Sequence, residues 1–297
     1  MRILVTGSNG LLGQKLTALV QQDSSAYLIA TAKTNTVLPI RQGEFHTLDI
    51  TDKAEVNKII SLTHPDVVIN AAAMTQVDQC ESAREACWKT NVTAVGNLIE
   101  ASRNNKVHLV HASTDFIFDG SQELLDETAI PNPINYYGES KLAGEQLILE
   151  SSISWCIVRT VLVFGITQDI SRSNIVLWVK KNLEQGKTIQ VVNDQWRTPT
   201  LAEDLASGCY LAARKKATGI FNVSGKDYLS IYDIAIRTAD FFKLDKSLIK
   251  ETDSTKFTQP ARRPLKTGFI IEKARKELGY EPHSFEEGLR IVASQLK

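Results

Sequence analysis

The chain is poor in cysteine, histidine and proline, and none of these residue types is concentrated in one segment. The four cysteines of the 297 residues form no Cys-x-x-Cys pair, which excludes a disulfide framework and a thiolate zinc site as its organising feature. Sparse cysteines of this kind are typical of free thiols in a reducing cytoplasm. Because the five histidines are scattered, the sequence predicts no metal site.

The chain also lacks an excess of charge of one sign and any long apolar run. Lys+Arg and Asp+Glu each number 34, whereas a nucleic-acid-binding protein usually carries a basic surplus. No apolar run approaches the roughly 18–20 residues that a membrane-spanning helix needs. The apolar N-terminus breaks at Gly7 and has no signal-peptide layout. We therefore expect a cytoplasmic protein that binds neither nucleic acid nor a membrane.

The first half alternates short, continuous apolar runs with helix-like stretches. Continuous apolar runs are typical of parallel strands buried on both faces. Their alternation with helices predicts a doubly wound, Rossmann-type α/β sheet. The expected strands are 3–6, 27–31, 66–70, 108–111 and 155–159, and the expected helices are 11–22, 52–63, 82–104 and 136–151.

The second half is less regular, and no linker marks where it begins. We predict a dinucleotide-binding domain over 1–165. Residues 166–297 are expected to form mainly a smaller α/β cap that binds substrate, with a possible strand or helix returning to the sheet. Helices are expected near 171–185, 202–214, 230–243 and 284–295, and short strands near 188–192 and 219–223.

The first expected strand runs directly into three evenly spaced glycines, and a helix follows. Gly7 permits a tight turn, Gly10 lets the backbone approach a pyrophosphate, and Gly13 lets the helix press against the strand. The pyrophosphate charge then faces the N-terminus of the helix. This context predicts a dinucleotide site, to which Leu11 and Leu12 also contribute.

The end of the second expected strand indicates which dinucleotide is bound. An NAD site usually places an acidic residue there for the ribose 2′-hydroxyl. No acidic residue stands between Asp23 and Glu44, and Lys33 is available for a 2′-phosphate. The sequence therefore favours NADP(H), with NAD(H) left open and a solvated loop lysine as the alternative for Lys33. Further expected cofactor contacts are Asp49 and Ile50 near the adenine, and the small residues Ala71, Ala72 and Ala73.

Proton-transfer chemistry is predicted around Tyr137 and Lys141, which stand four residues apart and so share one face of a helix. An ammonium stabilises a nearby phenolate, so we expect Lys141 to lower the pKa of Tyr137 and make it a general acid or base. At the carboxyl end of strand 108–111, Thr114 or Ser113 offers a hydroxyl to a substrate carbonyl. Asp115 offers a carboxylate to sugar hydroxyls.

Taken in chain order, these segments resemble the extended short-chain dehydrogenase/reductase superfamily and, within it, the dTDP-4-dehydrorhamnose reductase family. The segments that carry the resemblance are spread over nearly the whole chain. They are the glycine loop, Asn70-Ala-Ala-Ala, Ser113-Thr-Asp, Tyr137-Gly-Glu-Ser-Lys141, Asn193-Asp-Gln and Arg262-Arg-Pro264.

The resemblance implies NAD(P)H-dependent reduction of the C4 keto group of a nucleotide-linked 6-deoxyhexose, foremost dTDP-4-dehydro-L-rhamnose to dTDP-L-rhamnose, a precursor of cell-envelope polysaccharide. It implies that Tyr137 donates the proton, that Lys141 holds the nicotinamide ribose and that Thr114 completes the catalytic triad. Asn91 resembles the helix asparagine that supports a proton relay in the superfamily, with a helix-interior polar residue that has a local partner as the alternative. The implied substrate contacts are Thr114, Asp115, Trp196 and Arg263.

Three departures from the family pattern leave the sugar open, and one of them is the bulky and charged pair Trp196-Arg197 after Asn193-Asp-Gln. Val161-Leu162-Val163 stands where a tryptophan is often found, and Phe116 stands where a tyrosine is often found. Alternatives are therefore another sugar-nucleotide reductase or epimerase, and a non-catalytic NADP-binding regulatory subunit. The family also makes a homodimer possible, although nothing in the sequence indicates one.

Overall fold

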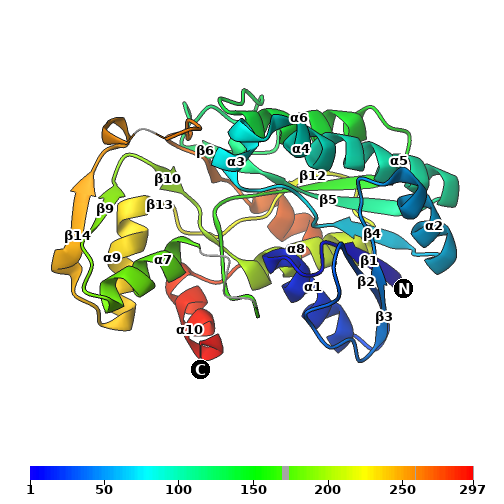
Figure 1. Ribbon diagram of the computed structural model, residues 1–297, viewed down its shortest axis with the longest axis horizontal. Coiled ribbons are helices and arrows are strands. Elements are labelled where there is room, and N and C mark those ends of the chain that lie inside the picture. The colour runs from blue at the N-terminus through cyan, green and yellow to red at the C-terminus, as the bar shows by residue number, and fades with distance from the viewer. Residues whose placement is uncertain (169–173, 258, 297) are drawn as a thin grey trace.

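The computed structural model describes residues 1–168, 174–257 and 259–296. Over these residues a parallel sheet of seven strands, in the order β12-β7-β5-β4-β1-β2-β3, carries helices on both faces (Figure 1). The predicted doubly wound α/β fold is therefore confirmed. The strands are β1 Arg2–Thr6, β2 Tyr27–Ala32, β3 Gly43–Thr47, β4 Val67–Asn70, β5 His108–Thr114, β7 Trp155–Thr160 and β12 Gly219–Asn222.

Both faces of the sheet are buried, as the continuous apolar runs predict. Along β1, Ile3 and Val5 pack on the side of α1 (Leu11–Gln22) and α8 (Ala202–Lys215). Leu4 belongs to the opposite apolar layer. This second layer is covered by α2 (Lys53–Thr63), α5 (Ala94–Asn105) and α6 (Tyr136–Leu149).

Helix α2 shows why several predicted boundaries hold. The Asp52 side chain accepts hydrogen bonds from the backbone N–H groups of Ala54 and Glu55, which caps the first turn. His64 ends the helix in the left-handed conformation, and Pro65 follows. The expected helix 52–63 is confirmed with Asp52 as its cap.

The expected helix 82–104 is confirmed as a continuous helical stretch over residues 84–105, which begins two residues later than expected and contains a π turn. Helix α3 (Val77–Ser82) ends at Ala83, whose backbone is not helical, and α4 (Arg84–Trp88) follows. A π-helical turn over Lys89–Thr93 then joins α4 to α5. Such wide turns insert an extra residue and are frequent at functional sites. Here the π turn contains Asn91, whose side chain is buried against α6.

A smaller layer extends from the sheet at the left of Figure 1. Helices α7 (Ile175–Glu184) and α9 (Ile231–Phe242) pack on the parallel pair β9 (Ile189–Val192) and β14 (Ile249–Thr252), and α10 (Phe285–Gln295) packs on α9. Residues 171–173 of the expected helix 171–185 lie outside the described residues. The remaining strands are β6 Leu124–Leu125, β8 Val163–Phe164, β10 Trp196–Arg197, β11 Thr200–Leu201, β13 Leu229–Ser230 and β15 Gly268–Phe269.

The two parts of the chain are interleaved rather than joined end to end. After α7 and β9, the chain returns to the sheet, where α8 packs on α1 and β12 pairs in parallel with β7. Strand β15 pairs with β6 from the first half. Within the described residues, no helix combines the length and apolar character needed to cross a membrane.

Candidate active site

The glycine loop is built by close backbone contacts. Gly7 has φ +66°, and a Cβ on it would lie 2.9 Å from the Cα of Ala72. A Cβ on Gly13 would lie 2.1 Å from the carbonyl oxygen of Gly7, so only glycine allows α1 to sit this close to β1. Gly10 caps α1 and has no side chain to satisfy its first N–H groups. These groups are therefore available to an anion.

Asn9 joins the glycine loop to the loop that follows β2. Its Nδ2 donates to the Oγ1 of Thr34 at 3.2 Å and to the carbonyl of Asn35 at 2.9 Å, and its Oδ1 accepts from Val37 N–H at 3.2 Å. The loop carrying Lys33 is thus held beside the phosphate cradle. Sequence reasoning did not find this role, because Asn9 is only one variable position between two glycines.

Lys33 and Asp49, both predicted to contact the cofactor, contact each other. The Nζ of Lys33 lies 3.1 Å from the Oδ2 of Asp49, and the Lys33 side chain is 57% exposed. The ion pair stands at the carboxyl end of β2, where the second ribose of a dinucleotide is expected. Ile50 is buried in the core and its carbonyl accepts from Asn97, so its predicted contact with adenine stays a prediction.

The three alanines follow β4 at the same edge of the sheet. The N–H of Ala72 lies 3.3 Å from both the Oγ1 of Thr6 and the Oδ1 of Asn70, which fixes the turn after the strand. Ala71, Ala72 and Ala73 are each partly exposed. Their small side chains leave the carboxyl end of β4 open next to Gly7.

Thr114, Tyr137 and Lys141 are brought together where β5 meets α6. Thr114 ends β5, its hydroxyl donates to the Oδ1 of Asp115 at 3.1 Å, and the same hydroxyl acts to lower the pKa of Tyr137. Tyr137 is in the first turn of α6, buried with its ring 5.6 Å from that of Phe116. One helical turn on, the Nζ of Lys141 donates to the carbonyl of Ala112 at 2.8 Å. The hydroxyl of Ser113 has no hydrogen-bond partner within the described residues.

The expectation that Lys141 lowers the pKa of Tyr137 is wrong for this structure. Burial raises the pKa of Tyr137, against a hydrogen bond with Thr114 that acts to lower it. Burial also lowers the pKa of Lys141, to about 8. The physical reason is that both groups lie in the interior, where loss of water disfavours each charged form more than one residue stabilises the other. The phenol is therefore held protonated.

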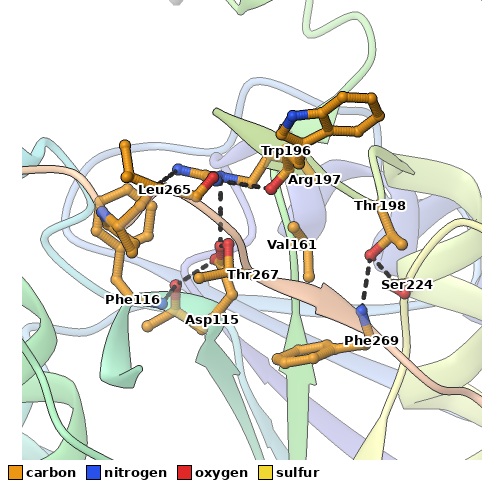
Figure 2. A network of polar contacts seen from close by, with 12 residues as sticks. Asp115, Phe116, Val161, Trp196, Arg197, Thr198, Ser224, Leu265, Thr267 and Phe269 are labelled. Atoms are coloured by element: carbon orange, nitrogen blue, oxygen red, sulfur yellow. Dashed lines mark hydrogen bonds and ion pairs between the residues drawn. The ribbon is translucent and has the colours of Figure 1, made fainter. Parts of the chain in front are cut away.

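Asp115 lies in a buried network rather than at an open surface (Figure 2). Its Oδ2 accepts from the hydroxyl of Thr267 at 2.5 Å and lies 3.7 Å from the Nε of Arg197. The Arg197 guanidinium also donates to the carbonyls of Trp196, Leu265 and Pro264. Asp115 thus ties the end of β5 to the segment after Arg263, and its predicted contact with a sugar hydroxyl stays a prediction.

The other two predicted substrate residues also have partners in the chain. Arg263 makes a bidentate ion pair with Asp78, with both N···O distances at 2.7 Å. The predicted contact of Arg263 with a substrate phosphate stays a prediction. It requires the phosphate to replace Asp78 as the partner of Arg263. The ring of Trp196 packs 5.4 Å from that of Tyr228 and points away from Asp115 in Figure 2.

A cavity of about 350 Å³ lies in the smaller layer, beside β9 and α7. Trp178 and Phe257 give it aromatic walls, and Gln190 and Gln195 give it amide groups. This lining suits a flat heterocycle, which needs an apolar face and a few hydrogen-bonding groups. Sequence reasoning assigned none of these residues to a site, although Gln195 belongs to the segment Asn193-Asp-Gln that carries part of the resemblance.

Asn91 is the buried polar residue that joins three parts of the site. Its Oδ1 accepts from Met74 N–H at 2.9 Å, and its Nδ2 donates to the carbonyl of Met74 and to the Oγ of Ser140, each at 3.0 Å. The loop after β4 is thereby held against α6, one residue away from Lys141. The resemblance singled out Asn91 as a support for proton relay, and this role stays a prediction.

The whole chain, residues 1–297, matches the family described as the RmlD substrate binding domain. The chain belongs to this family. The resemblance found in the sequence, to the dTDP-4-dehydrorhamnose reductase branch of the extended short-chain dehydrogenases/reductases, is therefore confirmed.

Individual members of the family are similar along most of their length. The dTDP-4-dehydrorhamnose reductase of Aggregatibacter actinomycetemcomitans is 31% identical, over 98% of this chain and 98% of that protein. The methionine adenosyltransferase 2 subunit beta of Rattus norvegicus is 30% identical, over 85% of this chain and 76% of that protein. The family thus includes proteins with different names at equal sequence distance from this chain.

Solved structures share the architecture. The dTDP-4-dehydrorhamnose reductase of Clostridium acetobutylicum has a TM-score of 0.89 and 29% identity, covering 100% of this chain and 99% of that one. The dTDP-4-dehydrorhamnose reductase of Bacillus anthracis, solved in complex with NADP, has a TM-score of 0.85 and 28% identity, covering 99% of each chain.

Proposed function

We propose that the protein is a reductase that uses NADPH, and NADH less well, to reduce the C4 keto group of a dTDP-linked 6-deoxyhexose, converting dTDP-4-dehydro-L-rhamnose to dTDP-L-rhamnose. The observation that carries the proposal is the meeting of Thr114, Tyr137 and Lys141 at the carboxyl end of β5. This meeting lies at the same sheet edge as the glycine cradle, in a chain whose family includes enzymes named for this reaction.

The cradle fits a dinucleotide. Two of its glycines allow backbone contacts that any side chain would block, and the uncapped N-terminus of α1 faces the space where a pyrophosphate belongs. The Oγ of Ser8 is buried there without a hydrogen-bond partner among the described residues, which leaves it for a ligand. When bound, the dinucleotide supplies the hydride.

The chain's own residues manage the proton. Tyr137 is held protonated by burial, which is the form that a proton donor to a carbonyl oxygen requires. Thr114 orients the phenol and offers a second hydroxyl to the same oxygen. Burial lowers the pKa of Lys141 to about 8, and its side chain is available to the nicotinamide ribose. These roles agree with those that the family resemblance implies.

The cap supplies the nucleotide site in this proposal. The cavity between Trp178 and Phe257 has room for a pyrimidine. The four cysteines are free thiols, which fits the cytoplasmic location expected from the sequence.

The test is consumption of NADPH, followed by its absorbance, with freshly prepared dTDP-4-dehydro-L-rhamnose. NADH is run beside it, and GDP- and UDP-linked 4-keto sugars are run as competing substrates. We expect turnover with the dTDP sugar and a lower rate with NADH. Turnover with a GDP- or UDP-linked sugar alone would replace the proposed substrate, as the departures at Phe116 and Val161–Val163 allow.

The regulatory alternative is favoured by one observation, the 30% identity to a methionine adenosyltransferase beta subunit. If the protein binds NADPH, reduces none of these sugars and changes the rate of a methionine adenosyltransferase, this alternative replaces the proposed reductase.

A further inference from the structure

Three polar side chains stand in register across three neighbouring strands. Thr6 of β1 pairs with Asn70 of β4, and Asn70 pairs with His111 of β5. The Oγ1 of Thr6 lies 2.6 Å from the Oδ1 of Asn70, and the Nδ2 of Asn70 lies 3.0 Å from the Nδ1 of His111. The Nε2 of His111 then lies 3.2 Å from the Nζ of Lys141. The row therefore runs from the residue before Gly7 to the catalytic lysine.

The direction of hydrogen bonding in this row is fixed at its first end. The backbone N–H of Ala72 lies 3.3 Å from both the Oγ1 of Thr6 and the Oδ1 of Asn70, and it can only donate. The Asn70 oxygen must therefore face Ala72 and Thr6, because a reversed amide would place an N–H group against another N–H group. The Asn70 amide nitrogen is left to donate to the Nδ1 of His111.

This direction determines the tautomer of His111. A neutral imidazole that accepts at Nδ1 carries its hydrogen on Nε2. That hydrogen points at the Nζ of Lys141, which already donates to the carbonyl of Ala112. An ammonium has three donors and no acceptor, whereas a neutral amine has a lone pair that accepts the Nε2 hydrogen. The arrangement is satisfied only by the neutral amine.

We propose that Thr6, Asn70 and His111 form a positioning chain that disfavours the ammonium of Lys141 and brings its titration close to neutral pH. The proposal concerns how the proton on Lys141 is controlled, and only its catalytic consequence rests on the proposed function. His111 is a positioning residue, since it acts through Lys141.

The other groups that face Lys141 act in the opposite direction. Glu145, on the same helix, and Cys87, from α4, both favour the ammonium. The Glu145 carboxylate also forms an ion pair with Arg159, with N···O distances down to 2.6 Å. The guanidinium offsets much of the negative charge that would otherwise act on Lys141. Burial lowers the pKa of Lys141 to about 8 despite both groups, and it lowers the pKa of His111, so that the imidazole is neutral.

The tautomer is tested first in the wild-type chain without substrate, by the ¹⁵N chemical shifts of His111 at neutral pH. We expect Nε2 to carry the hydrogen and Nδ1 to accept. A hydrogen on Nδ1, or a charged ring, would overturn the proposal. Because this measurement needs no turnover, it tests the tautomer of His111 independently of the proposed reductase activity.

Two variants then test the effect on Lys141, whose titration is followed by the ¹³C shift of its Cε. Asn70→Asp offers a carboxylate to Nδ1, which moves the imidazole hydrogen there and leaves Nε2 to accept from the ammonium. His111→Phe removes the Nε2 hydrogen without adding charge. A rise of the Lys141 titration midpoint in this variant is therefore not caused by the charge of a new carboxylate. We expect the midpoint of Lys141 to rise by at least about one pH unit in both, a tenfold change in proton affinity.

His108→Gln is the matched control, because His108 is buried on the same strand but contacts Ser154 instead of Lys141. It should leave the midpoint of Lys141 unchanged. If the protein is the proposed reductase, the alkaline limb of its kcat profile should shift upward in Asn70→Asp with a smaller effect on KM. If the titration midpoint of Lys141 is unchanged in both Asn70→Asp and His111→Phe, the proposal is overturned and His111 only packs against its neighbours.

Discussion

The α-carbon of Gly13 lies directly against the carbonyl oxygen of Gly7, so that a methyl group on it would be 2.1 Å from that oxygen. Gly13→Ala should therefore push α1 away from β1 and lower the free energy of unfolding by about 1–3 kcal/mol, the usual effect of overpacking. It should also weaken dinucleotide binding, because the cradle loses its shape. Urea unfolding and a fluorescence titration with NADPH measure the two effects.

Gly96→Ala is the matched control for that change. Gly96 lies inside α5, and a Cβ there would meet only a side-chain atom of Leu147 at 4.0 Å. Alanine favours the helical conformation over glycine by up to about 1 kcal/mol, so this variant should be at least as stable as the wild type. Equal losses in both variants would contradict the close-contact explanation.

Tyr137→Phe should reduce turnover by at least about 100-fold, the usual size of a general-acid effect, and leave NADPH binding nearly unchanged. The variant removes the phenol that donates the proton to the carbonyl oxygen, but it keeps the aromatic ring and its contact with Phe116. Tyr136→Phe is the control, because Tyr136 packs against Trp88 and Arg84 instead. Unchanged turnover in Tyr137→Phe would remove this residue from the mechanism.

Lys33→Ala should weaken NADPH binding more than NADH binding. Only NADPH carries a 2′-phosphate, and the variant removes the cation that pairs with it. Asp49→Asn should do the reverse and strengthen NADPH binding by up to about fivefold, since the exposed ion pair that holds Lys33 is worth at most about 1 kcal/mol. Calorimetric titration with both dinucleotides distinguishes the two. Parallel losses for NADH and NADPH in Lys33→Ala would mean that this lysine is not near the 2′-phosphate.

Arg197→Met should lower the free energy of unfolding by about 3 kcal/mol or more. The variant leaves the buried carboxylate of Asp115 without its cationic partner and the carbonyl of Pro264 without its donor. Lys246→Ala breaks an ion pair with Asp240 that is exposed, and it should change stability by less than about 1 kcal/mol. Chemical denaturation that ranks the two variants equally would contradict the role assigned to the buried network.

The contribution of Lys141 to the stability of the fold should rise as the pH is raised above about 8. Burial lowers the pKa of Lys141 from 10.5 to about 8 in the folded chain, so between these values the unfolded chain binds the extra proton. Stability rises with pH wherever the unfolded state holds more protons, by up to about 1.4 kcal/mol for each pH unit. Buried Cys156 and Cys209, whose pKa values burial raises, contribute slopes of the opposite sign in this range. The slope of Lys141 should therefore appear as the difference between the unfolding free energies of the wild type and of Lys141→Met, measured between pH 8 and 10.

The sheet was predictable because its central strands are apolar on both faces, and this pattern survives in the sequence of β1, β4 and β5. Strand β3 is not among the strands expected from the sequence. Its residues include Glu44 and His46 and are mostly half-buried at the sheet edge, so no apolar run marks it. The π turn at Lys89–Thr93 was not predictable either, because local helix preference does not report the contacts of Asn91 with Met74 and Ser140.

The candidate site was predictable in its residue types but not in their partners. Tyr137 and Lys141 follow from helical spacing, whereas the contact of Lys141 with His111 depends on how α6 packs on β5. The prediction that the pKa of Tyr137 is lowered was wrong for a related reason, because the burial that raises this pKa is a property of the packed structure. The pair of Asp78 and Arg263 joins residues 185 positions apart, a distance over which spacing predicts nothing.

Strand β12 gives the molecule a particular order of assembly. Until Gly219–Asn222 has been synthesised, one side of β7 has no neighbouring strand and its backbone groups remain open to pairing with another chain. A fragment cut at residue 165 would keep the glycines and the tyrosine but expose that edge, and would tend to aggregate. The seven-stranded sheet is therefore completed only after α7, β9 and α8 have been synthesised, well beyond residue 165.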